Sequence, residues 1–137
     1  MILLDAYALV AFLAGNATGE HVRALLREGA GVTTANLAEA YEISERRFGV
    51  AIARSGEILE PLFDQALRTI PLDRVMAQRA AEMRAKHYHR AKRPISLADA
   101  ILIASAATDD AIATADPDVL AIAALEGITT IELPGEG

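Results

Sequence analysis

Apolar and polar positions follow two alternating patterns along the chain. Short apolar runs of the kind that form strands buried on both faces alternate with longer segments in which apolar residues recur at helical spacing. The runs predict strands over 2–4, 31–34, 67–72, 111–115 and 128–133; the segments between them predict helices over 6–13, 18–28, 36–48, 58–66, 74–88 and 97–107, and a last one from 117. Strands that alternate with helices over short connections predict an α/β domain with a parallel sheet covered on both faces.

Composition narrows the class of protein. A chain of 137 residues, with no repeat, low-complexity tract or Pro/Gly-rich linker, is expected to be one domain over 1–137. Its 53% hydrophobic residues exclude a disordered chain, and the lack of cysteine excludes disulfide frameworks and thiolate zinc sites. The start lacks the basic segment of a secretory signal, and the uncharged run 6–19 is too short to span a bilayer. We therefore expect a cytoplasmic protein with no membrane partner.

The charge is negative overall and unevenly distributed. A net charge of −6 argues against a generic DNA-coating protein. Residues 84–93 nevertheless hold five of the thirteen Lys and Arg residues and no acid, whereas the chain after Pro94 has eight acids and no Lys or Arg. We expect Arg90, Lys92 and Arg93 to bind a phosphate backbone. A solvated helix end, where cations are favoured, explains the same residues equally well.

Four acids stand in apolar surroundings, and each has a simple explanation as part of a helix start. Asp5 and Asp116 are in positions typical of N-caps, the latter followed by Pro117. The segments Asn36-Leu37-Ala38-Glu39 and Ser96-Leu97-Ala98-Asp99 have the spacing of a capping box, with Asn36 and Ser96 as the caps. Taken singly, none of the four acids requires a functional role.

Taken together, the same acids indicate a metal site. Asp5 and Asp116 directly follow predicted strands, and Glu39 and Asp99 fall in the first turns of helices. The carboxyl ends of parallel strands share one edge of a sheet, where α/β proteins keep their sites. Carboxylates that converge there repel one another, and a hard cation such as Mg²⁺ or Mn²⁺ relieves the repulsion. Such a site can activate water and stabilise a leaving oxygen, which is the chemistry of phosphodiester cleavage.

The blocks that carry these acids resemble the signature of the PIN domain in order and spacing, and most closely the VapC-type toxins of bacterial and archaeal toxin–antitoxin pairs. They are Leu3-Leu4-Asp5-Ala6-Tyr7-Ala8-Leu9, Asn36-Leu37-Ala38-Glu39, Ile95-Ser96-Leu97-Ala98-Asp99-Ala100 and Ala113-Thr114-Ala115-Asp116-Pro117-Asp118. The resemblance implies a three-layer α/β/α sandwich with a central, mainly parallel sheet. It also implies an acidic pocket that binds Mg²⁺ or Mn²⁺ and cuts RNA.

The resemblance assigns roles to individual residues. It implies a catalytic quartet of Asp5, Glu39, Asp99 and Asp116, metal ligands at Asp5, Asp99, Asp116 and Asp118, and supporting roles for Thr114 and Ser96. The chain departs from the family at Tyr7, where members usually have Ser or Thr two residues after the first acid.

Family membership further implies a homodimer and a small cognate antitoxin, of the VapB type, that blocks the pocket. The function expected from the sequence is thus a Mg²⁺- or Mn²⁺-dependent endoribonuclease toxin. Two alternatives stay open. One is a Mg²⁺-dependent phosphatase of the haloacid-dehalogenase kind, because Asp116 and Asp118 have its Asp-x-Asp spacing, although that motif belongs after the first strand. The other is a catalytically weak RNA-binding module, with the pocket degenerate at Tyr7.

Overall fold

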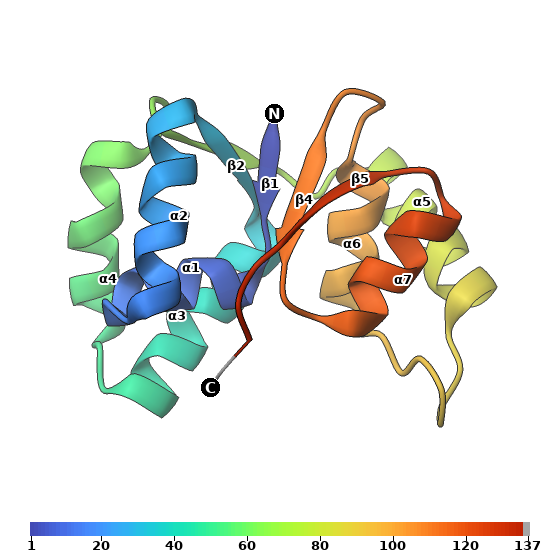
Figure 1. The fold of residues 1–137 in the computed structure, drawn as a ribbon, viewed down its shortest axis with the longest axis horizontal. Coiled ribbons are helices and arrows are strands. Elements are labelled where there is room, and N and C mark those ends of the chain that lie inside the picture. The colour runs from blue at the N-terminus through green and yellow to red at the C-terminus, as the bar shows by residue number, and fades with distance from the viewer. Residues whose placement is uncertain (136–137) are drawn as a thin grey trace.

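A computed structural model describes residues 1–135 of the chain, and Figure 1 shows the alternation of strands and helices within them. The strands are β1 (Ile2–Leu4), β2 (Ala30–Thr33), β3 (Leu67–Ile70), β4 (Ala111–Thr114) and β5 (Thr129–Glu132). The helices are α1 (Ala6–Ala14), α2 (Ala17–Glu28), α3 (Thr34–Phe48), α4 (Ile52–Leu59), α5 (Arg74–His87), α6 (Leu97–Ser105) and α7 (Pro117–Leu125), with a 3-10 turn, η1 (Glu60–Leu62).

The strands form one parallel sheet in the order β3-β2-β1-β4-β5. The chain builds the sheet outward from β1 to β3 in one direction, then returns and continues from β4 to β5 in the other. The winding therefore reverses between β1 and β4, where Leu4 lies opposite Ala113. In open α/β sheets, the crevice outside the carboxyl ends of the strands at such a reversal is where ligands bind.

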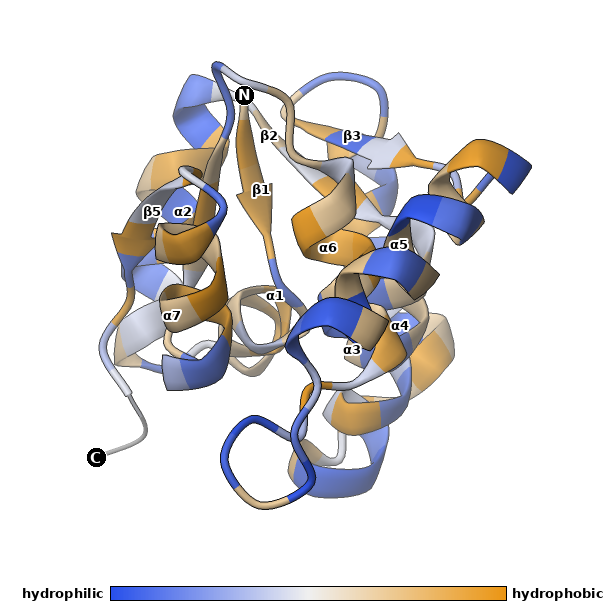
Figure 2. Ribbon diagram, turned by 90° about the vertical axis from the view of Figure 1, so that its right-hand side faces the viewer, coloured by the Kyte–Doolittle hydropathy of each residue, from blue (hydrophilic) through white to orange (hydrophobic). Residues whose placement is uncertain are grey.

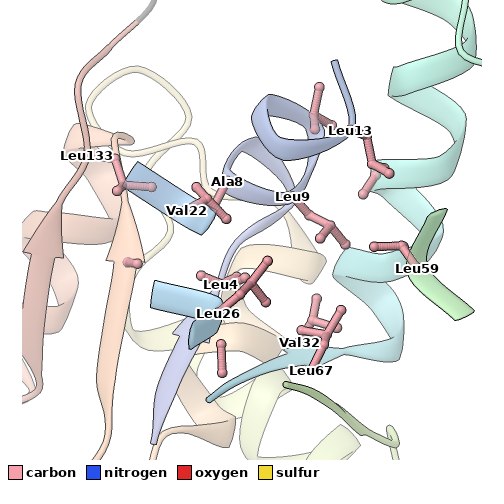
Figure 3. Close-up of a cluster of buried hydrophobic side chains, with 14 residues drawn as sticks. Leu4, Ala8, Leu9, Leu13, Val22, Leu26, Val32, Leu59, Leu67 and Leu133 are labelled. Atoms are coloured by element: carbon pink, nitrogen blue, oxygen red, sulfur yellow. The ribbon is translucent and has the colours of Figure 1, made fainter. Parts of the chain in front are cut away.

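Helices cover both faces of the sheet, which confirms the predicted three-layer α/β/α fold. Helices α1–α4 lie on one side and α5–α7 on the other (Figure 1). Figure 3 shows the core on the α1–α4 side, where sheet residues Leu4, Val32 and Leu67 pack with helical leucines and Val22. The second core joins sheet residues Leu3 and Ile112 to apolar residues of α5, α6 and α7. Adjacent strand residues point to opposite faces, so Leu3 and Leu4 serve different cores.

One predicted helix is wrong. The helix expected over 58–66 lies earlier in the chain as α4 (Ile52–Leu59), and a 3-10 turn, η1, follows it. Pro61 lies in that turn; a proline in the interior of an α-helix would remove a backbone hydrogen bond and clash with the preceding turn. Among residues 1–135 no helix is both long and apolar enough to cross a membrane.

Candidate active site

Asp5 is the single residue between the end of β1 and the start of α1. It is the N-cap of α1: its Oδ1 accepts the backbone N–H of Ala8 at 2.8 Å. Its other oxygen, Oδ2, accepts the hydroxyl of Thr114 at 2.5 Å, and the side chain is buried, at 5% exposed. Capping thus accounts for one carboxylate oxygen, and a contact to the neighbouring strand accounts for the other.

Thr114 connects two of the predicted acids. It is the last residue of β4, and its hydroxyl oxygen accepts the backbone N–H of Asp116 at 3.0 Å while it donates to Asp5. Asp116 is the N-cap of α7, and its Oδ1 accepts the N–H of Asp118 at 2.8 Å. Asp118 is half-buried in the first turn of α7. The supporting residue Thr114 therefore holds Asp5 and Asp116 together across the reversal between β1 and β4.

Asp99 lies in the first turn of α6, which covers the opposite face of the sheet from α1 (Figure 1). Ser96 is the N-cap of α6, with its Oγ accepting the N–H of Asp99 at 3.0 Å, as the capping-box spacing predicts. The residues that follow, Ala100 to Ile103, are buried. This packing fixes the first turn of α6, and with it the partly buried Asp99, against the body of the protein.

The hydrogen bonds around Glu39 differ from the prediction, in which Asn36 is the cap of the helix. Thr33, and not Asn36, is the N-cap of α3, because its Oγ1 accepts the backbone N–H of Asn36 at 3.0 Å. Asn36 lies inside the helix with its side chain fully buried, and its Nδ2 donates to Glu39 Oε1 at 3.1 Å. Helix α3 packs against both α1 and α6, and the charge of Glu39 acts on Asp5 and on Asp99 at the starts of those two helices.

The four acids act on one another electrostatically. Burial raises the pKa of Asp5 from 3.8 to about 6, against the lowering effect of its hydrogen bonds, and the negative charges of Asp116 and Glu39 add to the rise. The pKa of Asp99 is also raised to about 6, by burial first and then by Asp116, Glu39 and Asp5. Asp118 is not among the charges that act on either group. The fold therefore brings together Asp5, Glu39, Asp99 and Asp116.

The donor set suits a hard metal ion, although its side chains do not surround one as they stand. In the described part of the chain, no three acidic or histidine side chains are arranged so that they could hold a metal ion. Nor does any of the four acids form an ion pair with a described cationic side chain. Both carboxylate oxygens of Asp5 accept hydrogen bonds from the protein. A set of carboxylate oxygens, one buried and three half-buried, fits Mg²⁺ or Mn²⁺ in its chemistry.

The three predicted RNA-binding residues lie on a polar loop between α5 and α6. Figures 1 and 2 show this loop projecting on the side of the molecule toward which β1 runs. Arg90 and Lys92 are exposed and Arg93 is half-buried, and none of them forms an ion pair with a residue in 1–135. The turn is held by a backbone bridge between His89 and Arg93, and His89 Nδ1 accepts the N–H groups of Ala91 and Lys92.

Two features of the site were not predicted from the sequence. The hydroxyl of Tyr7 donates to the backbone oxygen of Pro134 at 2.8 Å, so it holds the segment after β5, and Thr114 supplies the hydroxyl bonded to Asp5. The sequence spacing predicts a helix cap at Asn36, whereas its side chain donates to Glu39. An asparagine three residues before an acid inside a helix gives the same spacing as a capping box, so only the position of the helix start distinguishes the two.

Comparisons with known proteins bear on the fold and the family of the chain. A search of curated protein sequences finds no match. Among solved structures, the chain resembles VapC20 of Mycobacterium tuberculosis, a toxin that cleaves the sarcin-ricin loop, with 17% identity, 99% of this chain and 92% of that chain covered, and a TM-score of 0.61. It also resembles FitAcB from Neisseria gonorrhoeae, with 24% identity, coverage of 96% and 97%, and a TM-score of 0.66.

A third similar structure is DNA-bound VapBC from Salmonella typhimurium, with 16% identity, 96% of each chain covered and a TM-score of 0.67. At these identities the likeness concerns the fold. The sequence model of the PIN domain matches residues 2–125, a span that includes all four acids and the basic loop. The chain therefore belongs to the PIN domain family.

Proposed function

We propose that residues 1–137 form a single PIN-type domain that cleaves RNA endonucleolytically with Mg²⁺ or Mn²⁺, and that acts in the cytoplasm as the toxin of a toxin–antitoxin pair. One observation carries the proposal: Asp5, Glu39, Asp99 and Asp116 meet where the winding of the sheet reverses, with raised pKa values at Asp5 and Asp99 and no described cation paired to them. Burying carboxylates in this way is costly unless a cation binds.

The proposal assigns different roles to the individual acids and to the residues that orient them. Asp5, Asp99 and Asp116 would hold the ion, with Asp118 as a further candidate ligand from the first turn of α7 and Glu39 adding its charge to that of Asp5 and Asp99. When bound, the metal lowers the pKa of water and stabilises charge on phosphoryl oxygens. Thr114 orients Asp5 by its hydroxyl and, through the same oxygen, fixes the backbone of Asp116. Ser96 fixes the first turn of α6 and thereby Asp99.

The basic loop supplies the contact to substrate in this proposal. Arg90, Lys92 and Arg93 offer positive charge on the side of the sheet where the acids lie, and an acidic pocket by itself would repel an RNA backbone. The purely acidic composition after Pro94 makes this loop the nearest cationic segment in sequence to Asp99. The hydrogen bonds to His89 hold the loop in one shape, which limits the entropy lost when RNA binds.

The partners in the proposal are a cognate antitoxin and a second copy of the chain. The structure of VapBC from Salmonella typhimurium contains a toxin with its antitoxin and DNA, and its fold over 96% of this chain supports the same kind of partner here. A protein that closes an acidic pocket most simply inserts a cation, and arginine suits carboxylates through its two-pronged geometry.

The experiment that tests the proposal is an RNA cleavage assay with end-labelled structured RNA, run with Mg²⁺, with Mn²⁺ and with EDTA. We expect internal cuts that require the metal and are abolished by Asp99→Asn. A parallel assay with a small phosphomonoester separates a phosphatase from a nuclease. Cleavage that persists in EDTA or in Asp99→Asn, or hydrolysis of the phosphomonoester alone, would overturn the proposal. RNA binding without metal-stimulated cutting would instead favour the catalytically weak module.

A further inference from the structure

Asn36 is a polar side chain with no exposed surface in the first turn of α3, and it is not the N-cap of that helix. Thr33 caps the helix, so the amide of Asn36 is not needed for that purpose. A buried amide is costly unless its donors and acceptors are satisfied. The NH₂ group of Asn36 therefore needs a partner beyond the capping residue.

The contacts of Asn36 form a directed chain from the end of β2 to Glu39. Thr33 Oγ1 accepts the backbone N–H of Asn36 and donates to its Oδ1 at 3.1 Å, and Asn36 Nδ2 then donates to Glu39 Oε1 at 3.1 Å. A carboxylate only accepts hydrogen bonds, so the NH₂ group must face Glu39 and the amide oxygen must face Thr33. The orientation of the amide is thereby fixed at both ends.

Glu39 needs such a restraint more than the other acids. Asp5 and Asp116 have short side chains that bind the backbone of their own helix starts. Glu39 has a longer side chain, is only half-buried, and its negative charge acts on those of Asp5 and Asp99. Repulsion and rotamer freedom both favour its release into solvent. The hydrogen bond from Asn36 opposes that release.

We propose that Asn36 is a positioning residue, which holds the carboxylate of Glu39 toward the acidic site before metal and RNA bind. The inference rests on the proposed function for its consequence: Glu39 is not among the three acids assigned to hold the ion, but its carboxylate, held beside them, adds negative charge that raises the affinity of the site for a divalent cation. Residues that orient metal-binding groups typically change metal affinity by about 10–100-fold when they are replaced.

The test combines Asn36→Ser with Glu39→Ala in a double-mutant cycle, with Mn²⁺ affinity measured by calorimetry. Serine keeps a small polar side chain at this buried position, but its Oγ stands where Asn36 has Cγ and is too short to reach Glu39. We expect Asn36→Ser to weaken Mn²⁺ binding about 10-fold or more in the wild-type background and less than about 2-fold in the Glu39→Ala background. Asn16→Ser, at the exposed N-cap of α2, is the matched control and should leave the affinity unchanged. Equal losses in both backgrounds would show that Asn36 acts only on the fold.

A second measurement needs neither metal nor RNA. In the metal-free protein, NMR should show the side-chain NH₂ protons of Asn36 protected from exchange with water, and Glu39→Ala should remove much of that protection. If the wild-type protein binds no Mn²⁺ and cuts no RNA, the proposed function fails. The NMR result still shows whether Asn36 donates a hydrogen bond to Glu39. Protection that Glu39→Ala does not change would overturn the role of Asn36.

Discussion

Removing one negative charge from the acidic site should make the metal-free protein more stable. In Asp99→Asn the side chain keeps its shape and loses its charge, while Ser96 still caps α6 through the backbone of residue 99. The folded protein holds the proton of Asp99 more tightly than the unfolded chain does, because its pKa is about 6 against an ordinary value of 3.8. The free energy of unfolding of the wild-type protein therefore falls as the pH rises from about 4 to about 6, and it stays at the lower value above pH 6.

The size of the effect follows from the shift in pKa. The difference between a pKa of about 6 and the ordinary value of 3.8 corresponds to about 3 kcal/mol for a fully buried group, at 1.36 kcal/mol per pKa unit. Asp99 is only partly buried, and solvent screening reduces this to ~1–2 kcal/mol. With a slope of about 2 kcal/mol per molar urea, the unfolding midpoint of Asp99→Asn should rise by about 0.5–1 M at pH 8. At pH 4 the two proteins should have nearly equal midpoints.

The assay is urea unfolding followed by circular dichroism, in EDTA, at pH 4 and pH 8. The matched control is Glu20→Gln, which removes an acid from the first turn of α2 where the side chain is 74% exposed. It should change stability by less than about 0.5 kcal/mol at either pH, since only a weak surface pair and the helix dipole are affected. Added Mn²⁺ should stabilise the wild-type protein and have little effect on Asp99→Asn. A variant no more stable than wild type at pH 8 would refute the electrostatic reasoning.

Three further outcomes are expected. Replacing Arg90, Lys92 and Arg93 together with alanine should weaken RNA binding and flatten its dependence on salt, by roughly 0.7 in slope per lost phosphate contact, and an unchanged slope would mean that the loop is only a solvated connection. Thr114→Val should cost about 1–3 kcal/mol of stability and lower the cleavage rate, with Thr114→Ser restoring both, because the hydroxyl serves Asp5 and Asp116 at once. Excess Mg²⁺ or Mn²⁺ should oppose inhibition by the antitoxin, and Asp99→Asn should loosen the complex; an inhibited complex with metal bound and no antitoxin side chain in the pocket would contradict this.

The sequence predicts the fold class well because its signals are local and strong. The buried strands are short apolar runs, and helix starts such as those at Asp73 and Ser96 are marked by their caps. The error over 58–66 has a local cause too: the apolar residues around Pro61 suit a helix in pattern, but the proline confines the chain to a 3-10 turn. The convergence of Asp5 and Asp116 was predictable because parallel strands share an edge.

The details within the site could not be predicted, since they depend on contacts distant in sequence. Thr114 bonds Asp5 across 109 residues and Tyr7 bonds Pro134 across 127, and no local pattern reports such pairs. The contact between Asn36 and Glu39 could not be predicted for a different reason. Thr33 and Thr34 are both plausible starts for α3, and a shift of the helix start by three residues turns a cap into a buried contact with Glu39.

The most direct test of the proposed metal site is an anomalous-scattering map from crystals of this protein soaked in Mn²⁺. We expect one strong peak bounded by the carboxylates of Asp5, Asp99 and Asp116, accompanied by small rotations that free carboxylate oxygens from their protein donors. The peak should be absent from crystals of Asp99→Asn treated in the same way. A well-diffracting soak with no peak among these acids, or with a peak only elsewhere, such as at His87 and Glu126, would contradict the central claim.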